Sequence, residues 1–166
     1  MIRPMRRGAQ ELPKNETLEI LNTATSGVLA LSGDDGYPYA VPMSFVYSDG
    51  KIYFHSAVEG HKIDAIKRCE KASFCVIADD GIIPEKYTTA YKSVIAFGKI
   101  RIADGEEVVE ALKLLGRKYA PDDCHENLMN EISGAISRVA VLVLDIESAT
   151  GKEAKELMTK RKKGER

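Results

Sequence analysis

Residues 37–67 read YPYAVPMSFVYSDGKIYFHSAVEGHKIDAIK, and this stretch is the most informative part of the chain for both fold and function. Its composition predicts two strands, at residues 37–47 and 51–56, joined by a turn at Ser48-Asp49-Gly50. Asp-Gly between apolar runs is the strongest short hairpin signal. A helix is expected to begin near Gly60. The stretch therefore indicates an antiparallel hairpin that leads through a polar loop into a helix.

The loop between the second strand and the helix has the composition of an anion site. His55 and Ser56 end the strand, and Gly60-His61-Lys62 stand at the helix start. A helix start offers unpaired N–H groups and a partial positive charge, which favour a bound anion. These residues therefore predict a phosphate pocket, in which His61 pairs with phosphate or supplies a proton. A solvated histidine at 61, a surface lysine at 62 and a rim histidine at 55 remain the alternatives.

Composition limits the class of protein. The chain has 166 residues, 44% hydrophobic and 30% charged, which is typical of one soluble globular domain over residues 1–166. The formal net charge of -1 gives no basic field that would attract nucleic acid or an anionic membrane. No apolar run approaches the ~18 residues of a membrane span, and the N-terminus lacks the apolar region of a signal peptide. A flexible basic tail is expected at about residues 158–166.

Cysteine and histidine usage indicates a reducing compartment and no metal centre. Cys69, Cys75 and Cys124 are an odd number at scattered spacings, which favours free thiols in the cytoplasm over a disulfide framework. No CxxC or HxxxH pattern occurs, and Cys124-His125-Glu126 is expected in a loop far from His55 and His61. We therefore expect no metal.

The remaining pattern predicts a mainly β fold with flanking helices. Helices are expected at residues 14–24, 60–70 and 105–119, and further strands at residues 27–32, 73–78, 93–104 and 138–147, with a bulge or bend at Gly98. Six strands joined mostly by short hairpins indicate an antiparallel barrel or a highly curved sheet. No strand–GxGxxG–helix unit or Walker motif is present, so a Rossmann or P-loop fold has no support.

Eight short segments, in this order along residues 5–157, give the chain a family resemblance. They are Met5-Arg6-Arg7, Gly27-Val28-Leu29, Asp35-Gly36-Tyr37-Pro38-Tyr39, Val41-Pro42, Asp49-Gly50-Lys51-Ile52-Tyr53-Phe54-His55, Glu59-Gly60-His61-Lys62, Ser93-Val94-Ile95-Ala96-Phe97-Gly98-Lys99 and Thr150-Gly151-Lys152-Glu153-Ala154. The chain resembles the FMN-binding split-barrel proteins related to pyridoxamine 5'-phosphate oxidase. Within them it looks most like the nitroimidazole-resistance (Nim-type) branch.

The resemblance implies a six-stranded antiparallel split β-barrel that forms a homodimer and binds FMN in two clefts at the subunit interface. It implies that the phosphate lies at the strand end and helix start, and that the flavin edge lies along one strand, where backbone groups meet it. It also implies that the partner subunit contributes a strand near Ser93, and Lys152 is a further candidate from the C-terminal segment. The expected cofactor residues are thus Val41, Pro42, Met43, Ser44, His55, Ser56, Ala57, His61, Lys62, Ser93 and Lys152, with His61 as the candidate catalytic residue.

The function expected from the resemblance is a cytoplasmic oxidoreductase that reduces small molecules with electrons from NAD(P)H. Nitro-compound reduction is the activity that the nearest branch suggests. Three alternatives stay open at this stage: a haem-binding split barrel with a histidine as iron ligand, a deazaflavin protein, and a non-catalytic flavin or ligand sensor. No residue set in the sequence demands catalysis in the way that a Ser-His-Asp triad would.

Overall fold

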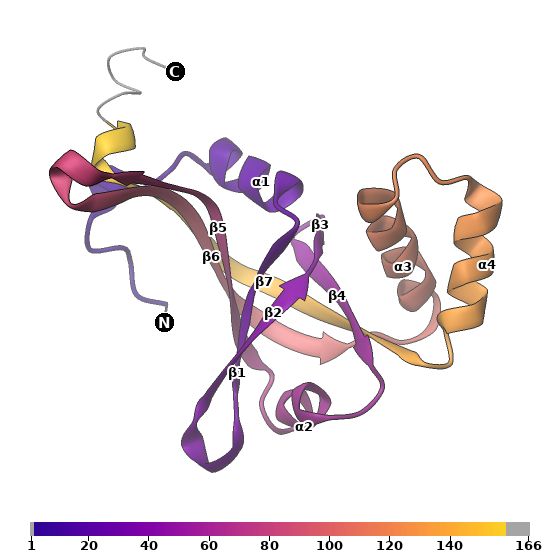
Figure 1. Cartoon of the computed structure of the whole chain (residues 1–166). Coiled ribbons are helices and arrows are strands. Elements are labelled where there is room, and N and C mark those ends of the chain that lie inside the picture. Colours follow the sequence, from indigo (N-terminus) through magenta and orange to yellow (C-terminus); the bar gives the residue numbers. More distant parts are fainter. Residues whose placement is uncertain (1, 159–166) are drawn as a thin grey trace.

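The protein, a computed structural model that describes residues 2–158, is built around one curled seven-stranded β-sheet with helices at its ends and side (Figure 1). The strands are β1 (Ser26–Ser32), β2 (Pro38–Ser44), β3 (Val46–Ser48), β4 (Lys51–Ala57), β5 (Lys71–Ile83), β6 (Thr88–Ile102) and β7 (Val139–Glu153). The α-helices are α1 (Lys14–Thr23), α2 (His61–Arg68), α3 (Gly105–Tyr119) and α4 (His125–Ala135). Short 3-10 helices are η1 (Gly8–Gln10), η2 (Asp34–Gly36) and η3 (Pro84–Lys86).

The strand order explains why the sheet curls into a split barrel. The order is β2-β1-β5-β6-β7-β4-β3, and every neighbouring pair is antiparallel. β2 and β3 stand at opposite ends of this order, yet only Phe45 separates them in the chain. The two ends of the sheet must therefore meet at Phe45. The predicted fold class is confirmed, and the strand count is seven rather than six because Phe45 divides the predicted strand 37–47.

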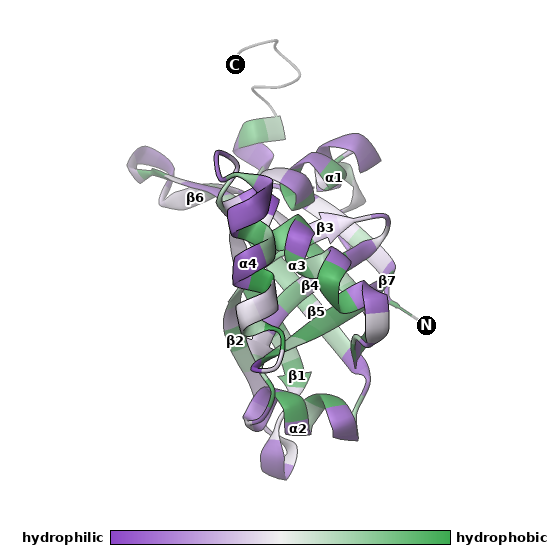
Figure 2. Ribbon diagram, turned by 90° about the vertical axis from the view of Figure 1, so that its right-hand side faces the viewer, coloured by the Kyte–Doolittle hydropathy of each residue, from purple (hydrophilic) through white to green (hydrophobic). Residues whose placement is uncertain are grey.

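The barrel interior is filled by apolar side chains of the inward-facing strand positions. Phe74 is fully buried, and its ring meets the rings of Phe45 and Phe54 edge-on at centroid distances of 4.8 and 5.0 Å. A second apolar cluster lies outside the barrel wall, where α3 packs Ala111 and Leu115 against β4 and β7. Figure 2 shows the strands behind α3 and α4 as largely hydrophobic, whereas much of the outer surface of α4 is hydrophilic.

Most predicted elements are confirmed, and their ends differ by a few residues. The predicted hairpin of residues 37–47 with 51–56 is confirmed only at Val46–Ser48 and Lys51–Tyr53, because Pro38–Ser44 pairs with β1 instead. β7 is buried at Ala140–Leu144, as its apolar run indicates. The predicted bulge is confirmed as well, because the β6–β7 register shifts between Phe97 and Gly98. A Cβ atom at Gly98 would lie 2.0 Å from the carbonyl oxygen of Asp145, so only glycine permits this close approach of two backbones.

The sequence prediction missed two features. α4 was not predicted, and the residues at its start, Cys124-His125-Glu126, were expected in a loop. The helix buries only Ile132, and its apolar periodicity is weak. β5 was expected to end near residue 78 and β6 to begin near residue 93. In the structure β5 continues to Ile83 and β6 begins at Thr88, and the additional residues pair to form an arm. Exposed residues dominate this arm, so no alternation of apolar and polar residues marks it. Of the tail predicted at residues 158–166, all but Met158 lies outside the described residues. Within residues 2–158, no helix has the length and apolar character needed to cross a membrane.

Candidate functional site

Two strand edges without a neighbouring strand in the described chain define the open side of the barrel. β2 pairs with β1 along Pro38–Ser44, and no strand pairs with its other edge. β4 pairs with β7 along its whole length but with β3 only over Lys51–Tyr53. The end of β4, residues 54–57, therefore has an unpaired edge as well. The predicted residues of both strands lie along these edges, where backbone N–H and C=O groups can meet a ligand.

The predicted residues on these strands point to different faces, because side chains alternate along a strand. On β2, Val41 and Met43 pack against the barrel interior, whereas Pro42 and Ser44 are exposed on the outer face. On β4, His55 is exposed and lies on the same face of the strand as Tyr53, which packs under α3. Ser56 lies on the same face as Phe54 and points toward the interior side of the barrel. His55 and Ser56 therefore do not converge on one ligand atom.

The start of α2 is held against the β1–β2 turn by the side chain of His61. Its imidazole stacks on the ring of Tyr39 at 4.0 Å between centroids, with 17° between the ring planes. The Nε2 atom lies 3.4 Å from Oδ2 of Asp34. Arg68, at the other end of α2, approaches Oδ1 of the same carboxylate at 2.6 Å. Both ends of α2 are thus tied to one turn.

The backbone at this helix start remains available to an anion. Gly60, the residue before the helix, has φ 111° and ψ 178°, a conformation that strongly favours glycine. Gly60 has no side chain to cap the first N–H groups of α2, and within residues 2–158 no other side chain accepts a hydrogen bond from them. Lys62 is half-buried in the first turn and forms no ion pair with the described residues. This arrangement fits the phosphate of a nucleotide cofactor.

Ser93 and Lys152 lie elsewhere, on the outer face of the sheet. They are direct partners across β6 and β7. The ammonium group of Lys152 donates a hydrogen bond of 3.2 Å to the Tyr91 hydroxyl and lies 5.5 Å from the centre of that ring. Ser93 also pairs with Ile77 of β5. The sheet thus places these two residues on the face that carries Pro42, away from the interior side.

The same outer face exposes large apolar side chains. Val28, Cys75 and Ile95 occupy one row across β1, β5 and β6, and Phe97 lies in the next row. The exposed fractions of Val28, Ile95 and Phe97 are 40%, 41% and 39%, and that of Ile77 is 65%. We call the face formed by these residues the outer sheet face. An apolar patch of this kind on a sheet is typical of a surface that binds another protein chain.

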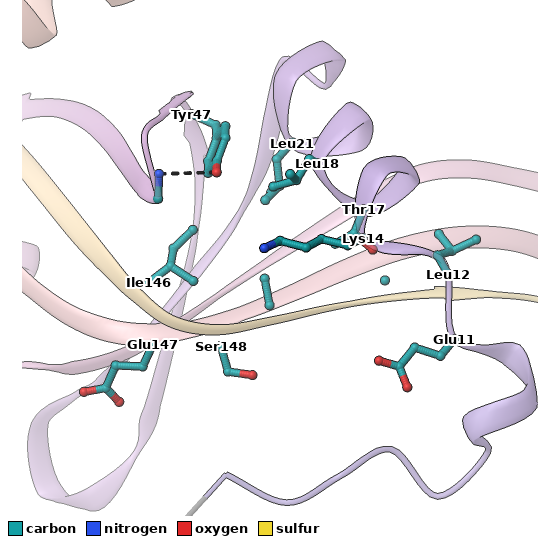
Figure 3. Close-up of a pocket in the computed structure, with 13 residues that line it drawn as sticks. Glu11, Leu12, Lys14, Thr17, Leu18, Leu21, Tyr47, Ile146, Glu147 and Ser148 are labelled. Carbon is teal, nitrogen blue, oxygen red and sulfur yellow. Dashed lines mark hydrogen bonds between the residues drawn. The ribbon is translucent and has the colours of Figure 1, made fainter.

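Two of the cavities among the described residues bear on the site. The first, about 390 Å³, lies between α1 and β7, and Figure 3 shows Lys14 extending across it toward Tyr47 and Ile146. Of the described residues that line it, none belongs to the predicted cofactor site. The second, about 370 Å³, we call the α3–α4 cavity. Its lining is Ser44, His55, Leu112, Leu115, Gly116, Tyr119, Glu131, Ile132, Ala135 and Val139.

The α3–α4 cavity brings together Ser44 and His55 from the predicted set, and the helices supply the rest of its wall. The sequence could not have indicated Glu131 or Ile132 as site residues, because α4 itself was not predicted. Tyr119 lies at the end of the helix predicted at residues 105–119 and was not indicated as a site residue. None of the described residues forms a cluster of three or more His, Cys, Asp or Glu side chains suited to a metal ion.

Residues at the two ends of α3 hold it against the sheet. Near its start, Glu107 pairs with Arg101 and Lys51 at 2.6 and 3.2 Å, and the hydrogen bond from Arg101 is the main cause that lowers the pKa of Glu107 to about 2. Near its end, Lys118 donates a 2.6 Å hydrogen bond to the carbonyl oxygen of Ala24, and burial lowers its pKa. These contacts fix the wall of the α3–α4 cavity relative to the strands.

Solved structures of known fold are similar to this chain. A candidate 5-nitroimidazole antibiotic resistance protein from Bacteroides thetaiotaomicron is 24% identical, with 86% of each chain covered and a TM-score of 0.74. An FAD-binding protein from Mesorhizobium loti is 24% identical, with 87% of this chain and 97% of that chain covered and a TM-score of 0.60. A flavocytochrome from Azotobacter vinelandii is 18% identical, with 92% and 73% covered and a TM-score of 0.74.

Identities this low show a shared fold, and the family rests on a separate comparison. No curated protein matches the chain. The family model of pyridoxamine 5'-phosphate oxidase matches residues 13–153, which is most of the chain. The resemblance that was recognised on the segments between residues 5 and 157 is therefore confirmed, and the chain belongs to the pyridoxamine 5'-phosphate oxidase family.

Proposed function

We propose that the chain is a cytoplasmic, homodimeric, FMN-binding oxidoreductase that reduces small molecules, nitro compounds among them, with electrons from NAD(P)H. The observation that carries the proposal is the uncapped start of α2, with Lys62 in its first turn, next to the open strand edges of the barrel. Family membership and the similarity to an FAD-binding protein and a flavocytochrome support a flavin. The similarity to the candidate nitroimidazole-resistance protein supports the substrate class.

The residues present fit a flavin mononucleotide in two respects. The N–H groups at the start of α2 and the ammonium group of Lys62 suit a phosphate dianion. The free edge of β2 along Val41–Ser44 offers backbone donors and acceptors, which suit the polar edge of a flat heterocycle. FMN rather than riboflavin is proposed because the phosphate is the group that this helix start would recognise.

The chain's own residues would bind and orient the cofactor, which supplies two-electron redox chemistry when bound. Lys62 would neutralise the phosphate. His61 stays a candidate for moving a proton, although its Nε2 lies 3.4 Å from Asp34 and its ring is stacked on Tyr39. In this arrangement His61 also positions α2, so its substitution would alter the phosphate pocket even if no proton passes through it.

The homodimer is proposed on the outer sheet face. This face exposes four large apolar side chains to water, those of Val28, Ile77, Ile95 and Phe97. Burying them against a second copy of the chain would be favourable. Ser93 and Lys152 lie on this face, so they would contact the cofactor of the partner more readily than that of their own chain. This gives a reason for two predicted cofactor residues to be remote from α2.

Absorbance spectroscopy with FMN and riboflavin tests the cofactor. We expect the purified chain to retain FMN more tightly than riboflavin. Replacing both His61 and Lys62 by alanine should weaken FMN binding about tenfold or more, because a charge-assisted contact is lost, and leave riboflavin binding unchanged. Lys62→Met tests the charge alone. Lys67→Ala, at the other end of α2, is the matched control and should retain wild-type affinity.

Each alternative has its own outcome when the spectra are repeated after incubation with haem and with deazaflavin and when turnover is assayed. Equal loss of FMN and riboflavin in the double variant would contradict the phosphate assignment. A Soret band after incubation with haem, without flavin retention, would replace the flavin proposal by a haem protein. Retention of deazaflavin would show that the cofactor is a deazaflavin and not FMN. If the chain retains flavin but does not turn over NADH or NADPH with an acceptor, a non-catalytic sensor would replace the reductase proposal.

A further inference from the structure

The α3–α4 cavity has the size and lining of a small-molecule site. Its volume of about 370 Å³ lies within the range of pockets that hold small organic ligands. Aliphatic side chains make up much of its wall, from Leu112 and Leu115 on α3, Ile132 and Ala135 on α4, and Val139 on β7. Such a wall suits the faces of a flat apolar ring.

A few polar groups interrupt this apolar wall. The imidazole of His55 and the carboxylate of Glu131 form no hydrogen bond or ion pair with any described residue, so both are available to a ligand. The hydroxyl of Tyr119 is already engaged, because it accepts a 2.8 Å hydrogen bond from the N–H of Phe45 and contacts the carbonyl oxygens of Phe45 and Thr25. The free groups are therefore one carboxylate, one imidazole and the hydroxyl of Ser44, and each of them can accept a hydrogen bond.

We propose that the α3–α4 cavity binds flat aromatic or heteroaromatic molecules that carry N–H donors and are neutral or cationic. We further propose that it is the site of the electron-accepting substrate, and this second statement rests on the proposed function. The ring lies between the aliphatic side chains of α3 and α4. Its N–H groups donate to Glu131 and His55.

The charges around the cavity separate this ligand from the phosphate of FMN. No lysine or arginine of the described chain lines the cavity, and Glu131 would repel a phosphate dianion. The cationic group proposed for the phosphate, Lys62, lies at the start of α2 and does not line the cavity. Cofactor phosphate and aromatic substrate are thus assigned to different places, with the unpaired ends of β2 and β4 contributing to both.

The two helices of the cavity wall differ in how they are held, because α3 is fastened to the sheet and α4 can adjust its position. Tyr119 fastens the end of α3 to the strand break at Phe45. Gly116 allows α4 to approach closely, since a Cβ atom there would lie 2.3 Å from a methyl carbon of Leu128. α4 itself buries only Ile132. The α4 wall can therefore shift to fit rings of different size while the α3 wall stays in place.

Titration of the full-length chain with benzamidine, a flat aromatic cation, tests the proposal by calorimetry and ligand-observed NMR. The expected result is saturable binding of benzamidine, weaker binding of neutral benzamide and no binding of benzoate. Glu131→Gln should weaken benzamidine binding about tenfold or more, because a charge-assisted hydrogen bond is lost. Ala135→Phe and, separately, Leu112→Phe should fill the cavity and abolish binding. Glu126→Gln on the same helix, outside the lining, is the matched control and should bind as the wild type does.

The outcomes distinguish this site from the flavin proposal, because binding is measured without turnover. Equal affinities of the Glu131→Gln and Glu126→Gln variants would overturn the assignment, as would unchanged binding in both filled variants when circular dichroism shows that they are folded. Competition between FMN and benzamidine would show that the flavin ring itself occupies the cavity and would overturn the substrate site. Benzamidine binding to a chain that retains no flavin would uphold the ligand site while the reductase proposal fails.

Discussion

Tyr119 is the residue through which α3 reaches the break between β2 and β3. Its hydroxyl accepts a 2.8 Å hydrogen bond from the N–H of Phe45, a backbone group at the end of a paired strand. We expect Tyr119→Phe to lower the free energy of unfolding by about 1 kcal/mol, because a partly buried donor loses its partner. Urea denaturation followed by circular dichroism measures this change. Tyr37→Phe, whose side chain is 75% exposed, should change stability little; a comparable loss in both variants would contradict the role of Tyr119.

Gly98 is the second residue with a clear prediction. Gly98→Ala would place a Cβ atom 2.0 Å from the carbonyl oxygen of Asp145, so the bulge between β6 and β7 would have to shift. We expect the free energy of unfolding to fall by about 3 kcal/mol, or the chain to fail to fold. Gly134→Ala, on α4 with open space around it, should instead stabilise the chain by about 0.5 to 1 kcal/mol. Thermal denaturation compares the two, and similar melting temperatures would disprove the close-approach argument.

At the scale of elements, the start of α3 is joined to three strands by charge pairs. Glu107 on α3 meets Lys51 of β4 and Arg101 of β6, and Arg101 also meets Asp145 of β7 at 2.9 Å. The pKa of Glu107 is lowered from 4.5 to about 2, mainly by the hydrogen bond from Arg101. A lowered pKa in the folded state means that the stabilisation is present above the unfolded pKa and is lost as the pH falls through the folded value.

The pH dependence of Glu107→Gln follows from this sign. Near pH 7 the variant should be less stable than the wild type by about 1 to 2 kcal/mol, after allowing for the solvent that reaches both partners. The difference should shrink as the pH falls from about 4.5 toward about 2, where the wild-type carboxylate becomes protonated. Urea denaturation at several pH values measures it, with Glu126→Gln as the control. A difference that does not depend on pH would show that the charge pairs contribute nothing.

The elements also differ in how far the sequence could predict them. α3 was predicted with its observed bounds because Val108, Leu112 and Leu115 recur at helical spacing. α4 lacks such a stripe, since it rests on α3 through little more than Ile132 and Leu128. The β5–β6 arm projects from the barrel and has no core to pack against, so no binary pattern was available to predict it. Hydrophobic periodicity in a sequence reflects the burial of one face of an element, so it does not predict an element that buries few side chains.

At the scale of the whole molecule, the outer sheet face is the surface on which a dimer is expected. Replacing Phe97 by glutamate should make the chain monomeric, because a charge would be buried in the middle of an apolar interface. Ile95→Glu, in the adjacent row, should have the same effect. Analytical ultracentrifugation measures the mass. Ile136→Glu, an exposed apolar residue just after α4, is the control, and dimers that persist in the Phe97 and Ile95 variants would refute this interface.

The sequence alone determined the local features of this protein: the turn at Ser48-Asp49-Gly50, the helix start at Gly60-His61-Lys62, the bulge at Gly98 and the family. The turn, the helix start and the bulge each depend on neighbouring residues, because backbone preferences act over a few positions, whereas the family rests on segments spread along the chain. Only the tertiary structure decided that residues 38–44 pair with β1, that His61 lies against Tyr39 and Asp34, and that His55 shares a cavity with Glu131. These contacts join residues that are far apart in the chain, and the curl of the sheet and the packing of α4 bring them together.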